Sequence, residues 1–319
     1  MMTCWGIAET AGMMSQVRAL AKALDAKLDI KTLPIGKPWD LLPNLAYATP
    51  LGGMILKRIA PDINPPWPDV VISCGRRASM AALGLKRVIH NGKTKFIHIH
   101  HPCVPLKCFD LVVTVEHDNI EGANVIKTRF ALHSVTPATL AEAAQHFAPR
   151  FAAYPTPLVA VMLGGTTNQY DFTVEAMAQV VMALQRMLGA TPGSLLITSS
   201  RRTGDANIAM LKAVFANNPR VYIYNEKEEN PYMGMLALAG TIVVSNDSIN
   251  MMSEAAATGK PIYILQLPGH RDTKQARFAE KLIQSGIARP LAGKLESWQY
   301  EVSDEMEKLA AEVKRRLAL

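Results

Sequence analysis

The sequence predicts an α/β protein with two doubly wound parallel sheets, one in each half of the chain. Short apolar runs of strand length alternate with longer segments in which apolar residues recur at the period of a helix. The chain has 319 residues, 49% of them hydrophobic, which is enough to bury two cores. Residues 148–157, APRFAAYPTP, have neither period, so they separate the two halves.

The second half of the chain shows this alternation clearly. Its predicted strands are residues 158–163, 194–200, 221–224, 241–245 and 261–267. Its predicted helices are residues 172–188, 206–216, 231–239, 248–258 and 273–285. Because a helix follows each strand, we expect parallel strands with helices on both faces.

The first half repeats the pattern less regularly. Its predicted strands are residues 4–9, 27–35, 69–74, 95–100, 110–116 and 124–130, and its clearest helices are residues 12–25 and 138–147. We therefore predict a first domain at 1–150, a second at 157–295, and a charged C-terminal helix within 296–319 that can pack back on the first. Ligands of such sheets bind at the carboxyl ends of the strands, so we expect the two domains to face each other across a cleft.

The composition indicates the cellular compartment of the protein and the classes of partner that it can bind. No long apolar segment or signal peptide is visible, and the four cysteines lack metal or disulfide spacing, so the sequence predicts a cytoplasmic protein. The formal charge is +7, and residues 51–100 contain eight basic and two acidic residues. Such a surface attracts an anionic membrane, nucleic acid or an acidic substrate, although an ordinary solvated face explains it equally well. Aromatic residues make up only 6% and are not interleaved with the basic ones, which argues against nucleic acid.

Three polar motifs follow predicted strands of the second half. The first is Gly164-Gly165-Thr166, where glycines permit close approach of a ligand and nearby helix amides bind anions, although such a pair is often only a turn. The second is Ser199-Ser200-Arg201-Arg202, whose hydroxyl and guanidinium groups suit a phosphate or carboxylate, unless they form a solvated loop.

The third motif is NDSINMMSE at 246–254. Asn246, Asp247 or Ser248 is expected to cap the helix that follows. Capping does not explain Glu254, and an acidic side chain near a strand end can bind the hydroxyls of a ribose. We therefore predict that Asp247, Ser248, Ser253 and Glu254 contribute to a nucleotide site.

Polar residues also follow the predicted strands of the first half. Arg76 and Arg77 suit an acidic acceptor, although exposed arginines at a helix start are equally expected. The imidazoles at 98–101 and Cys103 suggest a metal, but strand alternation separates His98 and His100 from His101, so no metal site is predicted.

A general base would have to come from Glu9, His101 or Asp118, all near strand ends. We favour Asp118, for which a turn or capping role is the alternative.

Residues 41–61, LLPNLAYATPLGGMILKRIAP, form an apolar stretch that ends in Lys57 and Arg58. An apolar patch rimmed by cations is typical of proteins that bind a membrane surface. Packing of this stretch into the first domain is the alternative.

Two resemblances follow from these residues. SEAAATGKPIYIL and QARFAEKLIQSGIA resemble the nucleotide-sugar half of GT-B glycosyltransferases, especially the lipid-linked peptidoglycan transferases. That resemblance implies that the Gly-Gly loop meets a diphosphate, that Glu254 holds the ribose and that Gln275 meets the sugar.

VISCGRRAS, HHPCVPLKCFDLVVTVEHD, LGGTTNQY, LLITSSRRT and VSNDSINMMSEAAATGKPIYIL resemble the mitochondrial-fission ELM1-like family, in the same order along most of the chain. The resemblance also places Gly12 at the acceptor side. Met13 follows it where other members carry a charged or imidazole residue, so no acid/base role is assigned there.

Together these observations predict a GT-B-type, metal-independent glycosyltransferase without a cofactor, which uses a nucleotide-sugar and a membrane-associated or lipid-linked acceptor. Two alternatives remain. A sugar-nucleotide 2-epimerase has the same architecture, and a non-catalytic membrane-associated scaffold fits the ELM1-like resemblance.

Overall fold

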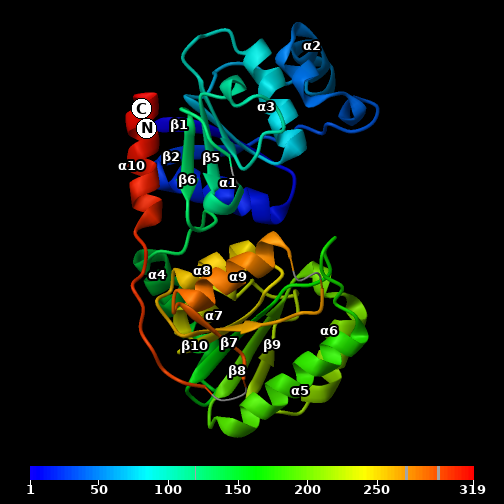
Figure 1. The fold of residues 1–319 in the computed structure, drawn as a ribbon, viewed down its shortest axis with the longest axis vertical. Helices are drawn as coiled ribbons and strands as arrows, with labels where there is room; N and C mark the ends of the chain where they lie inside the picture. Colours follow the sequence, from blue (N-terminus) through cyan, green and yellow to red (C-terminus); the bar gives the residue numbers. More distant parts are fainter. Residues whose placement is uncertain (119, 270–271, 293–294) are drawn as a thin grey trace. The chain divides into compact units, whose positions relative to one another are not determined.

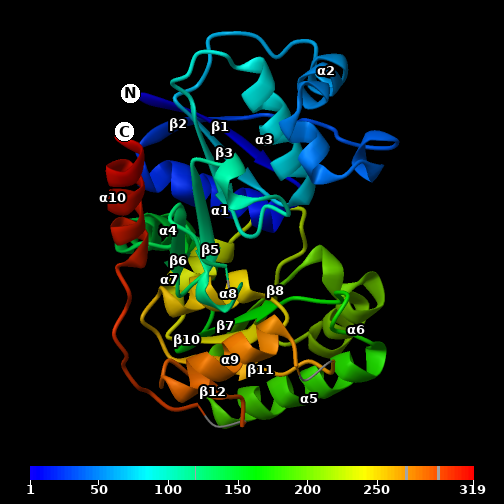
Figure 2. The ribbon, with the colours of Figure 1, turned by 45° about the horizontal axis from the view of Figure 1, so that its top comes forward.

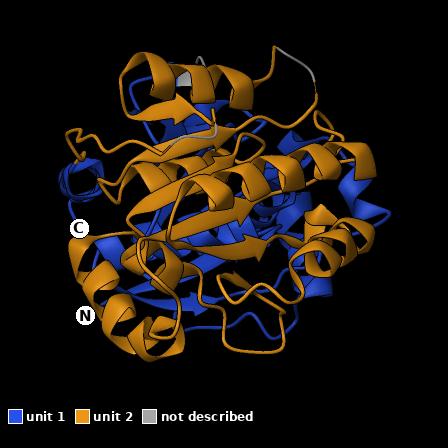
Figure 3. Cartoon of the chain, turned by 90° about the horizontal axis from the view of Figure 1, so that it is seen from below, with its two compact units in different colours: residues 1–134, 304–319 blue, residues 135–303 orange. Residues whose placement is uncertain are grey.

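The computed structural model describes residues 1–118, 120–269, 272–292 and 295–319, which form two compact units. Unit 1 comprises Met1–Ser134 and Asp304–Leu319, and unit 2 comprises Val135–Ser303 (Figure 3). Each unit contains one six-stranded sheet whose paired strands are all parallel (Figure 1). The predicted fold class, two doubly wound parallel α/β sheets, is therefore confirmed.

The sheet of unit 1 has the strand order β2-β1-β3-β4-β5-β6. Its strands are β1 (Met2–Ala8), β2 (Ala26–Ile30), β3 (Val70–Cys74), β4 (Lys95–Ile99), β5 (Leu111–Val115) and β6 (Val125–Thr128). Its helices are α1 (Ala11–Ala23), α2 (Pro50–Ile59), α3 (Arg76–Val88) and α10 (Glu305–Leu317). Because the chain order reverses between β1 and β3, the carboxyl ends of these two strands mark the switch point of this sheet.

Helices cover both faces of this sheet because side chains alternate along each strand. Cys4 and Ile72 pack with α1 and α10, whereas Trp5 and Val71 belong to the core under α2 and α3. Figure 2 shows α10 beside α1, although they come from opposite ends of the chain. The carboxylate of Glu305 accepts hydrogen bonds from the backbone amides of Arg129 and Phe130 (2.5 and 2.9 Å), which attaches α10 to unit 1.

The sheet of unit 2 has the strand order β12-β11-β10-β7-β8-β9. Its strands are β7 (Leu158–Leu163), β8 (Ser194–Ser199), β9 (Val221–Ile223), β10 (Thr241–Ser245), β11 (Ile262–Leu265) and β12 (Ala288–Pro290). Its helices are α4 (Pro137–Phe151), α5 (Val174–Ala190), α6 (Asp205–Phe215), α7 (Tyr232–Leu238), α8 (Ile249–Ala256) and α9 (Lys274–Gln284). Figure 1 shows α5 and α6 on one face and α7, α8 and α9 on the other. The switch point lies between β7 and β10.

The division of the chain differs from the boundary predicted at 148–157, because α4 belongs to unit 2. A side-chain carbon added at Gly234 of α7 would lie 2.5 Å from Phe147 of α4, so the two helices are in close contact. Arg150 also donates to the carbonyl oxygen of Glu229 (2.8 Å). The Pro- and Ala-rich stretch is therefore the last turn of α4 and its connection to β7, and the division falls before the N-cap Thr136.

Candidate functional site

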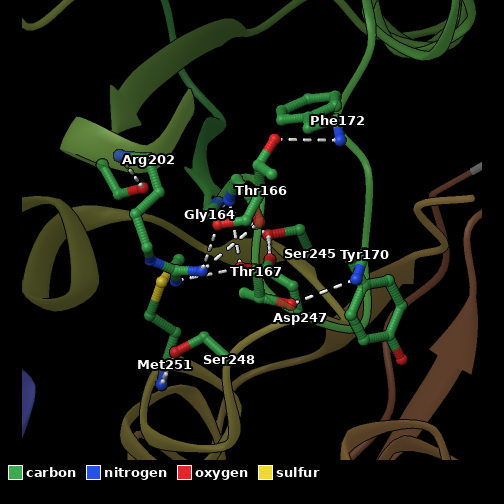
Figure 4. A network of polar contacts seen from close by, with 12 residues as sticks. Gly164, Thr166, Thr167, Tyr170, Phe172, Arg202, Ser245, Asp247, Ser248 and Met251 are labelled. Carbon is green, nitrogen blue, oxygen red and sulfur yellow. Dashed lines mark hydrogen bonds and ion pairs between the residues drawn. The ribbon is translucent and has the colours of Figure 1, made fainter. Parts of the chain in front are cut away.

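Three polar loops of unit 2 meet at the carboxyl edge of its sheet, around the switch point. They are residues 164–167 after β7, 200–203 after β8 and 246–248 after β10 (Figure 4). Ligands of doubly wound sheets bind at this position, because the helices on either side of the switch point diverge there. The three motifs that the sequence placed at strand ends therefore do come together.

Asp247 holds the three loops together. Its carboxylate is completely buried and accepts hydrogen bonds from the amide of Gly165 (3.0 Å) and the hydroxyl of Ser245 (2.7 Å). It also forms an ion pair with Arg202 (3.0 Å). A side-chain carbon at Gly164 would lie 2.0 Å from a carboxylate oxygen of Asp247, so only glycine fits beside it. Asp247 is therefore a buried residue that positions the three loops of the site.

Arg202 has a structural role that the sequence did not predict. Besides Asp247, its guanidinium contacts the carbonyl oxygens of Gly165 and Thr166 (3.3 and 3.5 Å). Its own carbonyl oxygen accepts from the amide of Thr166 (3.0 Å). Arg201 differs, because it is exposed and no described residue hydrogen-bonds or ion-pairs with its side chain. Of the two predicted anion-binding arginines, Arg201 is the one that remains available.

The amides of the glycine loop are engaged within unit 2 and are not free to bind an anion. The amide of Gly164 donates to the Ser245 hydroxyl (2.7 Å), that of Gly165 to Asp247, and that of Thr167 to the carbonyl oxygen of Tyr170 (2.9 Å). The Thr166 hydroxyl accepts from the amide of Phe172 (3.1 Å). The loop is thus a rigid part of the scaffold, because its backbone donors are satisfied within unit 2.

Helix α8 begins at the site as predicted from NDSINMMSE. Ser248 is its N-cap, and its hydroxyl accepts from the amide of Met251 (3.4 Å). Ser253 is completely buried on the inner face of α8, so its predicted contact with a ligand has no solvent-facing hydroxyl to make it. Ser199 and Ser200 are half-buried, and Ser200 caps the short turn that contains Arg201 and Arg202.

Glu254 is held by a partner that the sequence did not reveal. The hydroxyl of Tyr232, at the start of α7, donates to the carboxylate of Glu254 at 2.5 Å. Burial raises the pKa of Glu254 to about 7, and the hydrogen bond from Tyr232 opposes this shift. The second carboxylate oxygen of Glu254 has no hydrogen bond from the described residues, so Glu254 can still accept from a ligand.

A cavity of about 660 Å³ adjoins the site between the loop after β11 and α9. Tyr170, Asn246 and Gln266 contribute to its lining. The hydroxyl of Tyr170 hydrogen-bonds to that of Thr273 (2.9 Å), the N-cap of α9. Gln275, in the first turn of α9, has a buried side-chain oxygen without a hydrogen-bond partner among the described residues.

The predicted first-domain residues lie at the carboxyl edge of the unit 1 sheet. Glu9 follows β1 and accepts from the amide of Arg77 (2.6 Å), at the start of α3. Arg77 forms an ion pair with Asp40 (2.8 Å), and Arg76 donates to the Asp40 carbonyl oxygen (3.2 Å). Gly12 is exposed in the first turn of α1.

Asp118, the favoured candidate for the base, lies near the imidazole of His100. Its carboxylate accepts from the Thr114 hydroxyl (2.8 Å) and lies 3.8 Å from Nδ1 of His100. His100 has a φ of +75°, an uncommon conformation for a non-glycine residue that is enriched at functional sites. The predicted His101 instead accepts from the amide of Cys103 (2.9 Å), within its own turn.

His98 is a core residue of unit 1. It is completely buried, it hydrogen-bonds to Ser73 (2.8 Å), and burial lowers its pKa to about 3. In the described ranges of the chain, no three His, Cys, Asp or Glu side chains are grouped so that they could hold a metal ion.

Solved structures with this fold include a UDP-GlcNAc 2-epimerase and MurG. The UDP-GlcNAc 2-epimerase of Methanocaldococcus jannaschii matches with a TM-score of 0.61 and 11% identity, over 98% of this chain and 100% of that chain. MurG of Acinetobacter baumannii matches with a TM-score of 0.51 and 14% identity, over 100% of this chain and 92% of that chain. Together they establish that the fold is of the GT-B type.

Curated proteins give a closer relationship. The mitochondrial fission protein ELM1 of Arabidopsis thaliana is 32% identical over 277 residues, which cover 79% of this chain. The match spans only 64% of that longer protein. An uncharacterised protein of Rickettsia prowazekii is 28% identical over 100% of this chain and 99% of its own length. The model of the family described as mitochondrial fission ELM1 matches residues 11–317, so the chain belongs to that family.

Proposed function

We propose that this protein is a glycosyltransferase that takes its donor from a nucleotide-sugar and acts on a membrane-associated or lipid-linked acceptor. The proposal is carried by three features around the switch point of unit 2. Arg201 follows β8, α8 begins at Ser248 after β10, and Glu254 lies farther along α8 with one carboxylate oxygen bound by Tyr232. An unpaired cation, a helix N-terminus and a half-buried carboxylate are what a diphosphate and a ribose require.

In the proposed donor complex, Arg201 and the first turn of α8 bind the diphosphate. The positive end of the α8 dipole and the Arg201 guanidinium stabilise negative charge as the nucleotide leaves. Glu254 accepts from the ribose hydroxyls with the carboxylate oxygen that Tyr232 leaves available. Gln275, in the first turn of α9, is proposed to meet the sugar.

Unit 1 supplies the acceptor site and the general base in this proposal. A carboxylate that orients an imidazole is a recurring arrangement for proton abstraction, because it fixes the tautomer and stabilises the protonated ring. Oδ2 of Asp118 lies 3.8 Å from Nδ1 of His100, which is ion-pair distance for a protonated imidazole and longer than a hydrogen bond. We therefore assign His100 as the base and Asp118 as its positioning residue. Arg76 and Arg77 are proposed to face an acidic acceptor.

The membrane part of the proposal rests on α2 and the segment before it. Leu41, Leu45, Leu51 and Met54 expose 72%, 51%, 43% and 68% of their surface. Gly52 and Gly53 on the opposite side of α2 are buried, and α2 packs against α3 there. Lys57, Arg58 and Arg87 are exposed, and α2 and α3 bring Arg87 close to Gly53. This combination suits the surface of an anionic bilayer.

In the part of the chain that the structure describes, no helix combines the length and the apolar content needed to span a bilayer. The proposed attachment is therefore peripheral. The test uses vesicles with about 30% anionic lipid, which carry a negative surface charge like that of a cytoplasmic leaflet. The protein should sediment together with these vesicles. Met54→Glu should abolish co-sedimentation without lowering the melting temperature, because Met54 is exposed. Val214→Glu, at an exposed apolar position of α6 in unit 2, is the matched control.

The donor site is tested by the melting temperature in the presence of UDP, GDP, CMP, ADP and their sugars. A ligand that binds only the folded protein raises the melting temperature by mass action. Glu254→Ala and Arg201→Ala should each remove the shift, whereas Arg186→Ala, at an exposed arginine of α5, should keep it. If no nucleotide produces a shift at millimolar concentration, the transferase proposal is wrong.

Product analysis separates the alternatives once a nucleotide-sugar is found to bind. A transferase releases the nucleotide only when an acceptor is present, whereas an epimerase converts the sugar and releases no nucleotide. A non-catalytic scaffold binds vesicles with no turnover, and its function does not respond to Glu254→Ala.

A further inference from the structure

Unit 1 contains a second cavity of about 320 Å³ beside the first half of β1 and the edge strand β2. Its lining includes residues that precede β3, and thus lies away from Glu9 at the carboxyl end of β1. The side chains that matter here are Trp5, Trp67, Lys27, Lys31, Asp29 and Asn64. None of them belongs to the proposed donor or acceptor sites.

Two indole rings form a corner in this cavity. The ring centroids of Trp5 and Trp67 are 5.9 Å apart, and their planes meet at 74°. Trp5 is 7% exposed and lies at the base, whereas Trp67 is half-buried and stands at the side. Two nearly perpendicular rings suit a compact ring with an apolar face, because the electron-rich face of an indole attracts partly positive C–H groups.

The rim of the cavity is fixed by backbone contacts. The carboxylate of Asp69 accepts from both the amide and the hydroxyl of Thr3 (2.7 and 2.9 Å), and the amide of Asp69 donates back to the Thr3 hydroxyl (3.1 Å). These contacts attach the segment that carries Trp67 to the start of β1. The corner is therefore preformed, which lowers the entropic cost of binding.

The polar groups of the cavity are mostly unused hydrogen-bond donors. Lys31 is not one of them, because its ammonium lies 4.6 Å from the centre of the Trp5 ring and 2.5 Å from the carboxylate of Asp29. That ion pair also engages Asp29. No described residue hydrogen-bonds to the ammonium of Lys27, the amide of Asn64 or the indole nitrogens of Trp5 and Trp67. The cavity thus offers an unpaired positive charge and several donors, whereas its carboxylate is neutralised.

We propose that this pocket binds a small saccharide that carries a phosphate or carboxylate group. The apolar face of the sugar ring lies on Trp67, the hydroxyl oxygens accept from the indole and Asn64 donors, and the anionic group pairs with Lys27. Ligand pockets combine apolar walls with a few convergent polar groups in this way. The volume of the cavity accommodates one hexose with its charged substituent.

The test is a titration of the full chain with glucose 6-phosphate, glucuronate, glucose and inorganic phosphate, followed by saturation-transfer NMR and tryptophan fluorescence. The expected result is saturable binding of the two anionic sugars with a Kd of about 1 mM or tighter. Lys27→Ala should weaken this binding at least about 5-fold, because it removes the charge-assisted contact. Trp67→Phe should weaken it as well, and it keeps an aromatic ring against the core.

Three controls make the outcome decisive. Lys93→Ala, at another exposed lysine of unit 1, should leave the Kd unchanged, and Glu254→Ala should leave it unchanged as well, because that residue lies in unit 2. Binding of phosphate as tight as that of glucose 6-phosphate, or of glucose as tight as either anionic sugar, would contradict the proposal. So would the absence of saturation up to about 20 mM, or a Kd indifferent to both pocket variants.

Discussion

At the switch point of each sheet, one carboxylate accepts a hydrogen bond from a backbone amide that follows the neighbouring strand. In unit 1 this carboxylate is Glu9, which is exposed and accepts from Arg77 at 2.6 Å. In unit 2 it is Asp247, which is completely buried and also binds Ser245 and Arg202. Glu9 and Asp247 occupy similar places in their sheets, but Asp247 binds more polar groups than Glu9 does.

Asp247 is therefore a structural carboxylate inside unit 2, whereas the carboxylate of Glu9 is accessible to solvent. Asp247 has its hydrogen-bonding capacity engaged inside unit 2, so it shapes the loops, and the proposed ligand contacts are those of Arg201 and Glu254. Glu9 is exposed, and one of its oxygens accepts from the amide of Arg77 in the first turn of α3. A sequence motif with a conspicuous acidic residue can therefore mark the support of a site as well as its chemistry.

The largest expected difference in stability is between variants that replace Asp247 and Glu9. Asp247→Ala leaves the buried amide of Gly165 without its acceptor and removes the ion pair of Arg202, which should lower the free energy of unfolding by about 3–4 kcal/mol. Glu9→Ala should cost far less, because water replaces it at the exposed end of α3. Urea denaturation of both variants measures the difference, and equal losses would refute the distinction.

The glycines next to these carboxylates should differ in the same direction. A side-chain carbon at Gly165 would lie 2.1 Å from the backbone of Arg202, so Gly165→Ala forces backbone movement and should cost about 3 kcal/mol. At Gly75 it would meet the movable ends of Glu9 and Met13, although the φ of +105° strains any side chain there by about 1–2 kcal/mol. Denaturation midpoints with unchanged slopes would support this order, and a larger loss at Gly75 would reverse it.

The pH dependence of the free energy of unfolding tests whether ionisation of Glu254 destabilises the folded protein. Its pKa rises from the ordinary 4.5 to about 7 in the folded protein, so the folded state binds more protons between these values. The stability contribution of protonated Glu254 is therefore complete below pH 4.5 and is lost as the pH rises through about 7. Glu254→Gln, which keeps the acceptor for Tyr232, should raise the free energy of unfolding by about 3 kcal/mol at pH 8 and leave it unchanged at pH 4.

Denaturation of the wild type and Glu254→Gln across this pH range checks that prediction. An equal difference at both ends would mean that ionisation of Glu254 is not responsible. The proposed function adds a separate expectation, because the amide should still weaken nucleotide binding at pH 8 even as it stabilises the fold.

The smallest expected effect concerns the helix caps at the two switch points. Ser248→Ala and Thr10→Ala each remove a hydroxyl that accepts from a first-turn amide, at 3.4 and 3.3 Å, and should each cost about 1 kcal/mol. Thermal unfolding compares them directly. If Ser248→Ala also weakens nucleotide binding while Thr10→Ala does not, the first turn of α8 is part of the donor site.

The alternation of strands and helices was predictable because the spacing of apolar residues within each element indicates a strand or a helix. Residues 158–163 and 241–245 match β7 and β10 residue for residue, since buried parallel strands appear as continuous apolar runs. The assignment of α4 was not predictable in this way. Its amphipathic pattern says that one face is buried but not against which partner, and contact with Gly234 of α7 decides that it belongs to unit 2.

The sequence by itself determined the two parallel sheets, the position of polar motifs at strand ends and the capping of α8, because all of these depend on residues close together in the chain. Only the tertiary structure decided that Arg202 is bound to Asp247 and that Arg201 is not. It also decided that Tyr232 holds Glu254 and that His100, rather than His101, faces Asp118. Each of these pairs joins different elements, and its geometry depends on strand order and side-chain direction, which no local pattern contains.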